Sequence, residues 1–147
     1  MSRAAVDVDG RRVGEIGGGL LVLLGVEQGD TEAELEWCAQ KTAGMRIFPD
    51  ADDKMNRSVL EAGGGVLVIS QFTLLGDVQR GRRPSFVSAA PPELANPMYE
   101  RFCARLRELG LTVATGIFAA KMSVSLVNEG PVTIIVERPP GTATPST

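Results

Sequence analysis

Two short and largely apolar segments, at residues 20–26 and 66–72, limit the folds open to this chain. Each run is far shorter than the ~20 residues that a membrane-spanning helix requires. Each instead has the length and the apolar character of a β-strand that is covered on both faces. We therefore predict two buried strands at the centre of the fold and no contact with a membrane.

The segments around these runs predict further strands and two helices. Alternating apolar residues on both sides of Asp9-Gly10, a strong hairpin dipeptide, predict an antiparallel hairpin. A capping box of Thr31 and Glu34 should begin the first helix, and the second should span residues 91–110. Further short strands are expected at residues 47–48, 111–115, 122–127 and 132–136.

This mixture of strands and helices lacks the regular alternation of a parallel, doubly wound fold. We therefore predict an α+β fold with a mostly antiparallel, barrel-like sheet core and two main helices. A chain of 147 residues is long enough for one domain with one sizeable core. We assign that domain to residues 1–138 and expect the small, polar, proline-rich stretch 139–147 to be a disordered tail.

The chain contains no histidine, and this restricts its chemistry. The absence removes the most common general base, the imidazole of Ser-His-Asp and Cys-His devices, and the most common zinc ligand. Cys38 and Cys103 are expected to be reduced packing residues, and we predict neither a metal nor a cofactor. No signal sequence opens the chain, which predicts a cytoplasmic protein. The net charge of −3 requires any contact with nucleic acid to be local.

Two polar strings interrupt the apolar strands. Ser70-Gln71-Phe72-Thr73 lies where a buried strand leaves the sheet, a place where side-chain and backbone N–H groups can donate to one oxyanion. Asn128-Glu129-Gly130-Pro131-Val132-Thr133 lies between two apolar strands, and its Gly-Pro bond can be cis at a cost of only ~0.5 to 1 kcal/mol. Taken alone, the first string would be a structural strand end and the second an ordinary turn.

Together, the two strings resemble the paired signature of the D-aminoacyl-tRNA deacylases, the D-tyrosyl-tRNA deacylase family. The similarity covers residues 2–137 in unbroken order, in strings that include Gly14-Glu15-Ile16-Gly17, Arg46-Ile47-Phe48, Lys54-Met55-Asn56, Arg82-Arg83-Pro84-Ser85-Phe86 and Val124-Ser125-Leu126-Val127. The resemblance implies a deacylase-type fold, a homodimer, and hydrolysis of D-aminoacyl-tRNA to the free D-amino acid and tRNA. Such an enzyme would proofread chirality in translation.

The resemblance also implies how the substrate is selected. In that family the Gly-Pro motif of one subunit enters the pocket of the other, so Gly130 and Pro131 are expected to form a cis pair whose carbonyls grip the α-amino group of a D-aminoacyl group. An L side chain would collide with this wall, whereas glycine would escape the filter. Asn128, Val132 and Thr133 are expected to bind substrate beside the pair.

Hydrolysis further needs an oxyanion hole and an activated water. By resemblance, Ser70, Gln71, Phe72 and Thr73 are the catalytic residues, with the main-chain N–H groups near Phe72 and Thr73 as donors. Without histidine, two routes stay open: the 2′-hydroxyl of the terminal adenosine assists a water molecule, or Thr73 acts as a covalent nucleophile. We favour the first, because no base is adjacent to Thr73 in the sequence.

Two groups of residues are candidates for contact with the tRNA 3′ end. The first could surround the adenine, because unstacked bases favour aromatic and apolar platforms; it consists of Phe86, Phe118 and Met122. The second could bind phosphates and consists of Arg80, Arg82 and Arg83. The alternatives are core packing for the first group and a solvated loop for the second.

Two departures from the family pattern and two rival functions stay open. Met1 falls where the family already has most of its first strand, so a longer native N-terminus is expected, and Glu129 stands where aspartate is more frequent. The rivals are a non-catalytic module that binds tRNA 3′ ends and a deacylase that acts chiefly on mischarged glycyl-tRNA.

Overall fold

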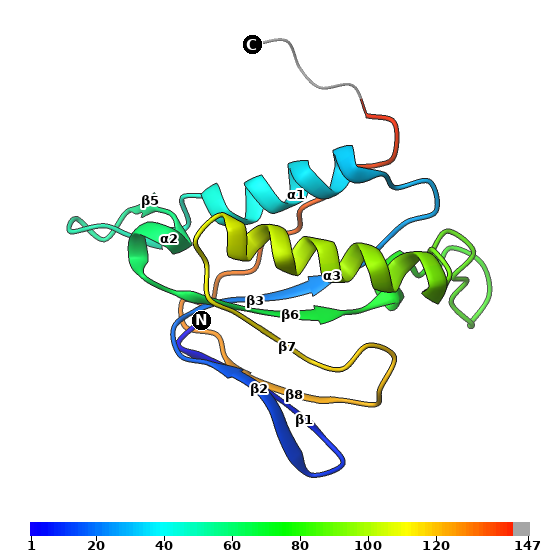
Figure 1. The fold of residues 1–147 in the computed structure, drawn as a ribbon, viewed down its shortest axis with the longest axis horizontal. Helices are drawn as coiled ribbons and strands as arrows, with labels where there is room; N and C mark the ends of the chain where they lie inside the picture. The colour runs from blue at the N-terminus through cyan, green and yellow to red at the C-terminus, as the bar shows by residue number, and fades with distance from the viewer. Residues whose placement is uncertain (143–147) are drawn as a thin grey trace.

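The structure is a computed structural model that describes residues 1–142, and its elements form three layers (Figure 1). Two long helices, α1 (Glu32–Gly44) and α3 (Pro92–Glu108), pack against each other over one face of a parallel sheet. An antiparallel sheet covers the other face. The predicted α+β fold with two main helices is confirmed. In the described residues the two sheets are separate and form no closed barrel.

The antiparallel sheet has the strand order β2-β1-β8. Its members are β1 (Arg3–Val8), β2 (Arg11–Ile16) and β8 (Ser123–Val127). The predicted hairpin is confirmed, since β1 and β2 meet at Asp9 and Gly10, whose φ angles are +51° and +76°. The type I′ turn, whose twist matches that of the two strands, requires a positive φ at both of its central residues. Asp and Gly tolerate this conformation, which explains the Asp-Gly pair at this position.

The second sheet is parallel, with the strand order β3-β6-β7. Its members are β3 (Gly19–Leu24), β6 (Gly65–Ser70) and β7 (Val113–Thr115). The two apolar runs predicted as strands are therefore β3 and β6, which lie in register. Parallel strands need long crossovers, and α1 and α3 lie within the two crossovers of this sheet. Over the described chain, three strand pairings are antiparallel and two are parallel, in line with the predicted predominance.

Local signals set the ends of the helices. Thr31 and Glu34 form the predicted capping box of α1, in which Glu34 Oε2 accepts a hydrogen bond from Thr31 N at 2.7 Å. Pro92 opens α3, where a missing N–H costs no hydrogen bond. None of the helices in residues 1–142 has the length and apolarity needed to cross a bilayer. The remaining elements are short: β4 (Phe48–Pro49), β5 (Met55–Arg57), α2 (Val59–Ala62) and the 3-10 helix η1 (Phe72–Leu75).

Strand β6 is the centre of the core because both of its faces are covered. Val66 and Val68 pack on the helix side in a cluster that includes Phe102 of α3. Leu67 and Ile69 pack on the opposite side against β1. Burial of such a side chain contributes about 1.5 to 3 kcal/mol, so β6 is held firmly in place. The position of its C-terminal end, where the first polar string begins, is fixed with it.

The two sheets end differently at their edges. At the closed edge, β2 lies against β7 so tightly that a Cβ atom on Gly14 would be 2.4 Å from Thr115 O. The other edge strands, β3 and β8, leave apolar side chains uncovered, and we call them the open edge strands. Leu23 of β3 is 41% exposed, and Val124 and Leu126 of β8 are 37% and 45% exposed. The prediction that β3 is covered on both faces is therefore wrong for this end of the strand, because β3 lies at the sheet's edge.

The strand predicted at residues 132–136 is also absent. This segment follows β8 as extended chain with no ladder partner in the described residues, and Ile134 and Ile135 are 50% and 82% exposed. Apolar β-branched residues favour a strand, but a strand also needs a neighbouring edge with which to pair. The sequence therefore showed an apolar, β-branched segment, but the prediction that this segment forms a strand is wrong.

The C-terminal segment then returns to the helix layer (Figure 1). The guanidinium of Arg138 lies 4.9 Å from the centre of the Trp37 ring, and Gly141 N donates to Glu34 Oε1 at 2.9 Å. The first residues of the expected disordered tail thus contact α1. Residues 143–147 of that tail lie outside the described residues.

Candidate active site

The first polar string lies at the C-terminal end of β6. Ser70 is the last residue of the strand, and Gln71 N donates to Leu24 O at 2.8 Å, which ties the string to the end of β3. Phe72 and Thr73 are the first residues of η1. The first N–H groups of a helix have no acceptor within the helix. The predicted oxyanion donors are therefore in a position where their N–H groups are available to a ligand.

The side chain of Gln71 contacts the hydroxyl of Thr73. Gln71 Nε2 donates to Thr73 Oγ1 at 3.1 Å, and Thr73 is exposed. A carboxamide N–H can donate but cannot accept a proton, so this contact orients the Thr73 hydroxyl without activating it as a nucleophile.

Two aromatic rings form one side of the string. Phe72 and Phe86 meet edge to face with their ring centres 5.1 Å apart, and both rings are partly exposed. Edge-to-face pairs contribute about 0.5 to 1.5 kcal/mol beyond their buried area. The structure therefore places Phe86, a predicted adenine contact, directly beside the predicted catalytic residues.

The other two predicted adenine contacts lie elsewhere. Phe118 packs against the helix-side core, with its ring centre 6.2 Å from that of Tyr99. Met122 packs against the cluster on the opposite side of β6. Both side chains are half-buried, so the structure favours the alternative of core packing for this pair.

The three predicted phosphate contacts lie together on one loop. Asp77 and Ser85 close this loop with two backbone hydrogen bonds, of 2.7 and 2.8 Å. Arg80, Arg82 and Arg83 lie between these two residues, and all three are exposed. Because the loop also leads to Phe86, it places positive charge next to the first string.

The second polar string follows β8, and its Gly130–Pro131 bond is cis, as the resemblance implies. Gly130 and Pro131 are exposed, whereas Asn128 and Val132 are half-buried. The side chain of Asn128 bridges the string: Nδ2 donates to Thr133 Oγ1 and Oδ1 accepts from Val132 N, both at 3.2 Å.

The two strings are far apart in one chain. Ser2 N donates to Val127 O at 3.0 Å, and Gly19 N donates to Met1 O at 3.1 Å, so β8 ends near the start of β3. The parallel register of β3 and β6 places that start at the end of the sheet opposite Ser70. Five residue steps at about 3.3 Å separate the two ends, so roughly 17 Å of sheet lies between the strings.

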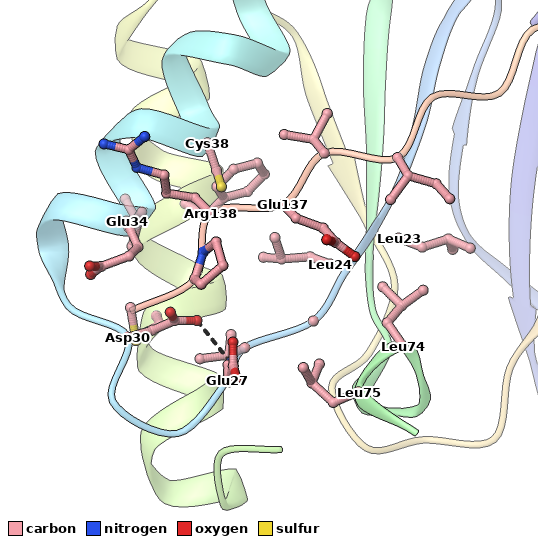
Figure 2. A pocket seen from close by; sticks show the side chains of 18 of the residues that line it. Leu23, Leu24, Glu27, Asp30, Glu34, Cys38, Leu74, Leu75, Glu137 and Arg138 are labelled. Carbon is pink, nitrogen blue, oxygen red and sulfur yellow. Dashed lines mark hydrogen bonds between the residues drawn. The ribbon is translucent and has the colours of Figure 1, made fainter. Parts of the chain in front are cut away.

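A cavity of about 620 Å³ adjoins η1 on the side of α1 (Figure 2). Leu74 and Leu75 of η1 lie at one end and Asp30 and Cys38 at the other, with the C-terminal segment as a wall. None of the four predicted catalytic residues, all of them described, lines it. This cavity was not predictable from the sequence, since its walls come from segments that only the tertiary fold brings together.

The titratable groups of the cavity are held by local contacts. Asp30 Oδ2 accepts from Glu27 N at 2.8 Å, and burial raises the pKa of Asp30. Burial likewise raises the pKa of the Cys38 thiol, and it raises that of Cys103 to about 11. Thiols with raised pKa values are poor nucleophiles, in agreement with their predicted role as reduced packing residues. Within residues 1–142, no group of three or more acidic or cysteine side chains is arranged to hold a metal ion.

Comparison with known proteins gives one consistent result. The family model described as D-Tyr-tRNA(Tyr) deacylase matches residues 1–137. The D-aminoacyl-tRNA deacylase of Shouchella clausii is 58% identical over 135 residues, which are 92% of each chain. That of Desulfitobacterium hafniense is 53% identical over 137 residues, covering 93% of this chain and 92% of the relative.

Solved structures have the same fold. A structure described as c-Myc DNA Unwinding Element Binding Protein superposes with a TM-score of 0.89 at 39% identity and covers 94% of both chains. A probable eukaryotic D-amino acid tRNA deacylase superposes with a TM-score of 0.70 at 18% identity, over 88% of this chain and 90% of its own. The second likeness concerns the fold alone.

Proposed function

This chain belongs to the D-aminoacyl-tRNA deacylase family, and from that premise we infer that it hydrolyses the ester bond between a D-amino acid and the 3′ end of tRNA. The products are the free D-amino acid and tRNA, so the enzyme is a carboxylic ester hydrolase that proofreads chirality in translation. We place its activity in the cytoplasm, where aminoacyl-tRNA is used.

We further propose that two copies of the chain form one pair of active sites. The observation that carries this proposal is the separation of the two polar strings, which lie at opposite ends of β6 in one chain. A second copy can supply the missing string. The uncovered apolar side chains of the open edge strands support such a partner, because a second copy could bury them at an interface.

In this dimer, the loop at Gly130 and Pro131 acts as a wall in the partner's pocket. The carbonyls of the loop bind the α-amino group of the substrate, and an L side chain would collide with the backbone. Rejection by a factor of ~10⁴ requires about 5.5 kcal/mol, which a backbone wall supplies better than a flexible side chain. Glycine has no side chain to collide, so we expect glycyl-tRNA to be hydrolysed as well.

Hydrolysis proceeds by attack of water on the ester carbonyl carbon. The negative charge that develops on the carbonyl oxygen is bound by the N–H groups of Phe72 and Thr73. The bond to the 3′-oxygen then breaks, and this oxygen takes up the proton that the attacking water has lost. The 2′-hydroxyl of the terminal adenosine assists the water. This route is supported by the contact at Thr73, whose hydroxyl receives a hydrogen bond from Gln71 and donates none to a basic side chain in residues 1–142.

The function is tested by rates on three substrates measured side by side. We expect D-tyrosyl-tRNA and glycyl-tRNA to be hydrolysed and L-tyrosyl-tRNA to be rejected by about 10⁴-fold. Binding of tRNA without hydrolysis would support the non-catalytic module instead. Hydrolysis of glycyl-tRNA alone would support the glycine-specific deacylase.

The two routes of attack are tested by a pair of changes. If the 2′-hydroxyl assists the water, Thr73→Ala keeps most of the activity, and a substrate with a 2′-deoxy terminal adenosine is not hydrolysed. The opposite pattern, together with a trapped aminoacyl ester on Thr73, would establish the nucleophilic route.

A further inference from the structure

The loop that contains Gly130 and Pro131 is closed by one side chain. Asn128 Oδ1 accepts a hydrogen bond from Val132 N, and Asn128 Nδ2 donates to Thr133 Oγ1, both at 3.2 Å. The two bonds join Asn128, two positions before the tip of the loop, to the two residues that follow the tip. Asn128 therefore spans the base of the loop, and Gly130 and Pro131 are its exposed tip.

Nothing in the backbone of the described residues performs the same task. β8 ends at Val127, and residues 128–133 are outside any strand ladder. No backbone-to-backbone hydrogen bond within residues 1–142 joins the two sides of this loop. A loop with exposed backbone and few buried contacts opens easily, so its shape depends on the Asn128 side chain.

We propose that Asn128 is a positioning residue for the selectivity of the enzyme: it holds the loop of one subunit at the height and angle at which the loop tip meets the α-amino group of the substrate. This proposal rests on the proposed function, in which the loop tip separates D from L substrates. The resemblance placed Asn128 among the substrate-binding residues, but both polar ends of its side chain are bonded within the loop, so it acts through the loop tip. Its hydrogen bonds keep the loop in one conformation, so that the loop does not move aside when an L side chain collides with it.

The alternative is that Asn128 is a purely structural turn residue. The chain contains a matched example, since Asp50 Oδ1 accepts a hydrogen bond from Lys54 N at 3.0 Å, with the same spacing of four residues. That contact lies in the turn between β4 and β5, far in sequence from both polar strings. Asp50→Ala is therefore the control: it removes the same kind of side-chain-to-backbone hydrogen bond from a turn outside the proposed site.

The test compares kcat and KM for D-tyrosyl-tRNA and L-tyrosyl-tRNA in Asn128→Ala, Asn128→Asp, Thr133→Val and Asp50→Ala. Asn128→Ala should lower the D-over-L ratio of kcat/KM by about tenfold or more, equal to ~1.4 kcal/mol. The change should come from a raised KM for the D substrate and a gained rate on the L substrate. Asn128→Asp can still accept hydrogen bonds from Val132 N and the Thr133 hydroxyl and should retain most of the ratio.

Thr133→Val removes one of the two bonds at an exposed position and should lower the ratio by about threefold, so the proposal stays testable even if Asn128→Ala does not fold. Asp50→Ala should leave the ratio unchanged. An unaltered ratio in both Asn128→Ala and Thr133→Val, with the dimer intact, overturns the proposal. Failure of the proposed function is distinct, because the unchanged protein would then show no D-over-L preference.

Discussion

The closed edge and the open edge strands differ in how completely they bury their apolar side chains. At the closed edge, β2 and β7 lie so close that Gly14 has room for no side chain. At the open edge strands, Leu23 and Leu126 remain more than 40% exposed although each lies in a regular strand. A single chain therefore buries the closed edge of its two-sheet core and leaves apolar side chains of the other edge uncovered.

We expect this difference to separate stability from activity within one small domain. The register places Val124 and Leu126 of β8 opposite Val6 and Ala4 of β1, which are 0% and 3% exposed. Directly opposed residues share a face of the sheet, so the exposed pair points to the core side and lacks only a cover. Changes at the closed edge should therefore alter folding, and changes at the open edge strands should alter assembly and with it the active site.

The largest effect is expected from a charge on an open edge strand. Leu126→Asp should convert the proposed dimer to monomers and lower kcat/KM for D-tyrosyl-tRNA by about a hundredfold or more, because an unpaired charge in an interface costs roughly 2 to 5 kcal/mol. Sedimentation and initial rates measure the two effects. Leu60→Asp is the control, since Leu60 of α2 is 40% exposed and Leu126 is 45% exposed. A fully active monomer would refute the shared site.

A smaller loss is expected from a methyl group at the loop tip. Gly130 has a φ of +128°, and a Cβ atom there would lie 3.0 Å from Val132 Cγ2 and 3.2 Å from Val132 N. Strain of this kind costs of order 1 to 3 kcal/mol, so Gly130→Ala should lower the D-over-L ratio of kcat/KM by roughly ten- to a hundredfold.

The control for Gly130 is Gly10, whose φ is +76° and around which a Cβ atom would meet nothing within 4 Å. Gly10→Ala lies in the β1–β2 hairpin. It puts an alanine at a positive φ, which strains the backbone, but its Cβ atom collides with no other atom. It should leave the ratio unchanged. Equal ratios in the two variants would mean that the loop at Gly130 is not the filter.

A change at the closed edge should affect stability alone. Gly14→Ala brings a Cβ atom to 2.4 Å from the backbone of Thr115, which cannot move aside cheaply. Overpacking typically costs about 1 to 3 kcal/mol, so the melting temperature should fall by several degrees. Below the transition, the D-over-L ratio and the dimer should persist. A changed ratio at full folding would show that the closed edge also shapes the site.

The same contrast explains how much of the fold was predictable from the sequence. Signals that act over a few residues were sufficient where they occur: Asp9-Gly10 specified the hairpin, and Thr31 with Glu34 specified the start of α1. The apolar runs specified burial but not strand direction, because parallel pairing depends on the crossovers. The segment 132–136 was misjudged because a strand requires a partner, and residues 1–142 provide none.

The candidate site divides in a similar way. The two polar strings stood out because they interrupt apolar strands, but only the resemblance assigned them a function. Of the three predicted adenine contacts, Phe86 lies beside Phe72 of the first string, whereas Phe118 and Met122 pack against the core clusters. The sequence alone could not separate these aromatic or apolar side chains. The side-chain contact of Asn128 within its own loop became visible only with the geometry.

The smallest expected effect concerns the link between the C-terminal segment and the helix layer. Hydrogen bonds from the Thr31 side chain, from Gly141 N and from Thr31 N lower the pKa of Glu34 to about 2. A carboxylate whose pKa is lower in the folded state adds stability above its unfolded pKa of 4.5, and that stability is lost as the pH falls toward 2. Glu34→Gln should therefore lower the melting temperature at pH 7 and flatten its decline between about pH 4.5 and pH 2.

Thr31→Val removes the first of these donors and should give part of the same flattening. Melting curves of the three proteins across this pH range measure both changes, and the D-over-L ratio at pH 7 should be the same in all of them. An equally steep decline in Glu34→Gln would assign the acid sensitivity to other carboxylates, such as Glu36, whose pKa the Arg105 guanidinium also lowers to about 2. Because Glu34 holds Gly141, which follows the segment 132–136 and the Gly130–Pro131 loop, a changed ratio would instead connect this link to the loop.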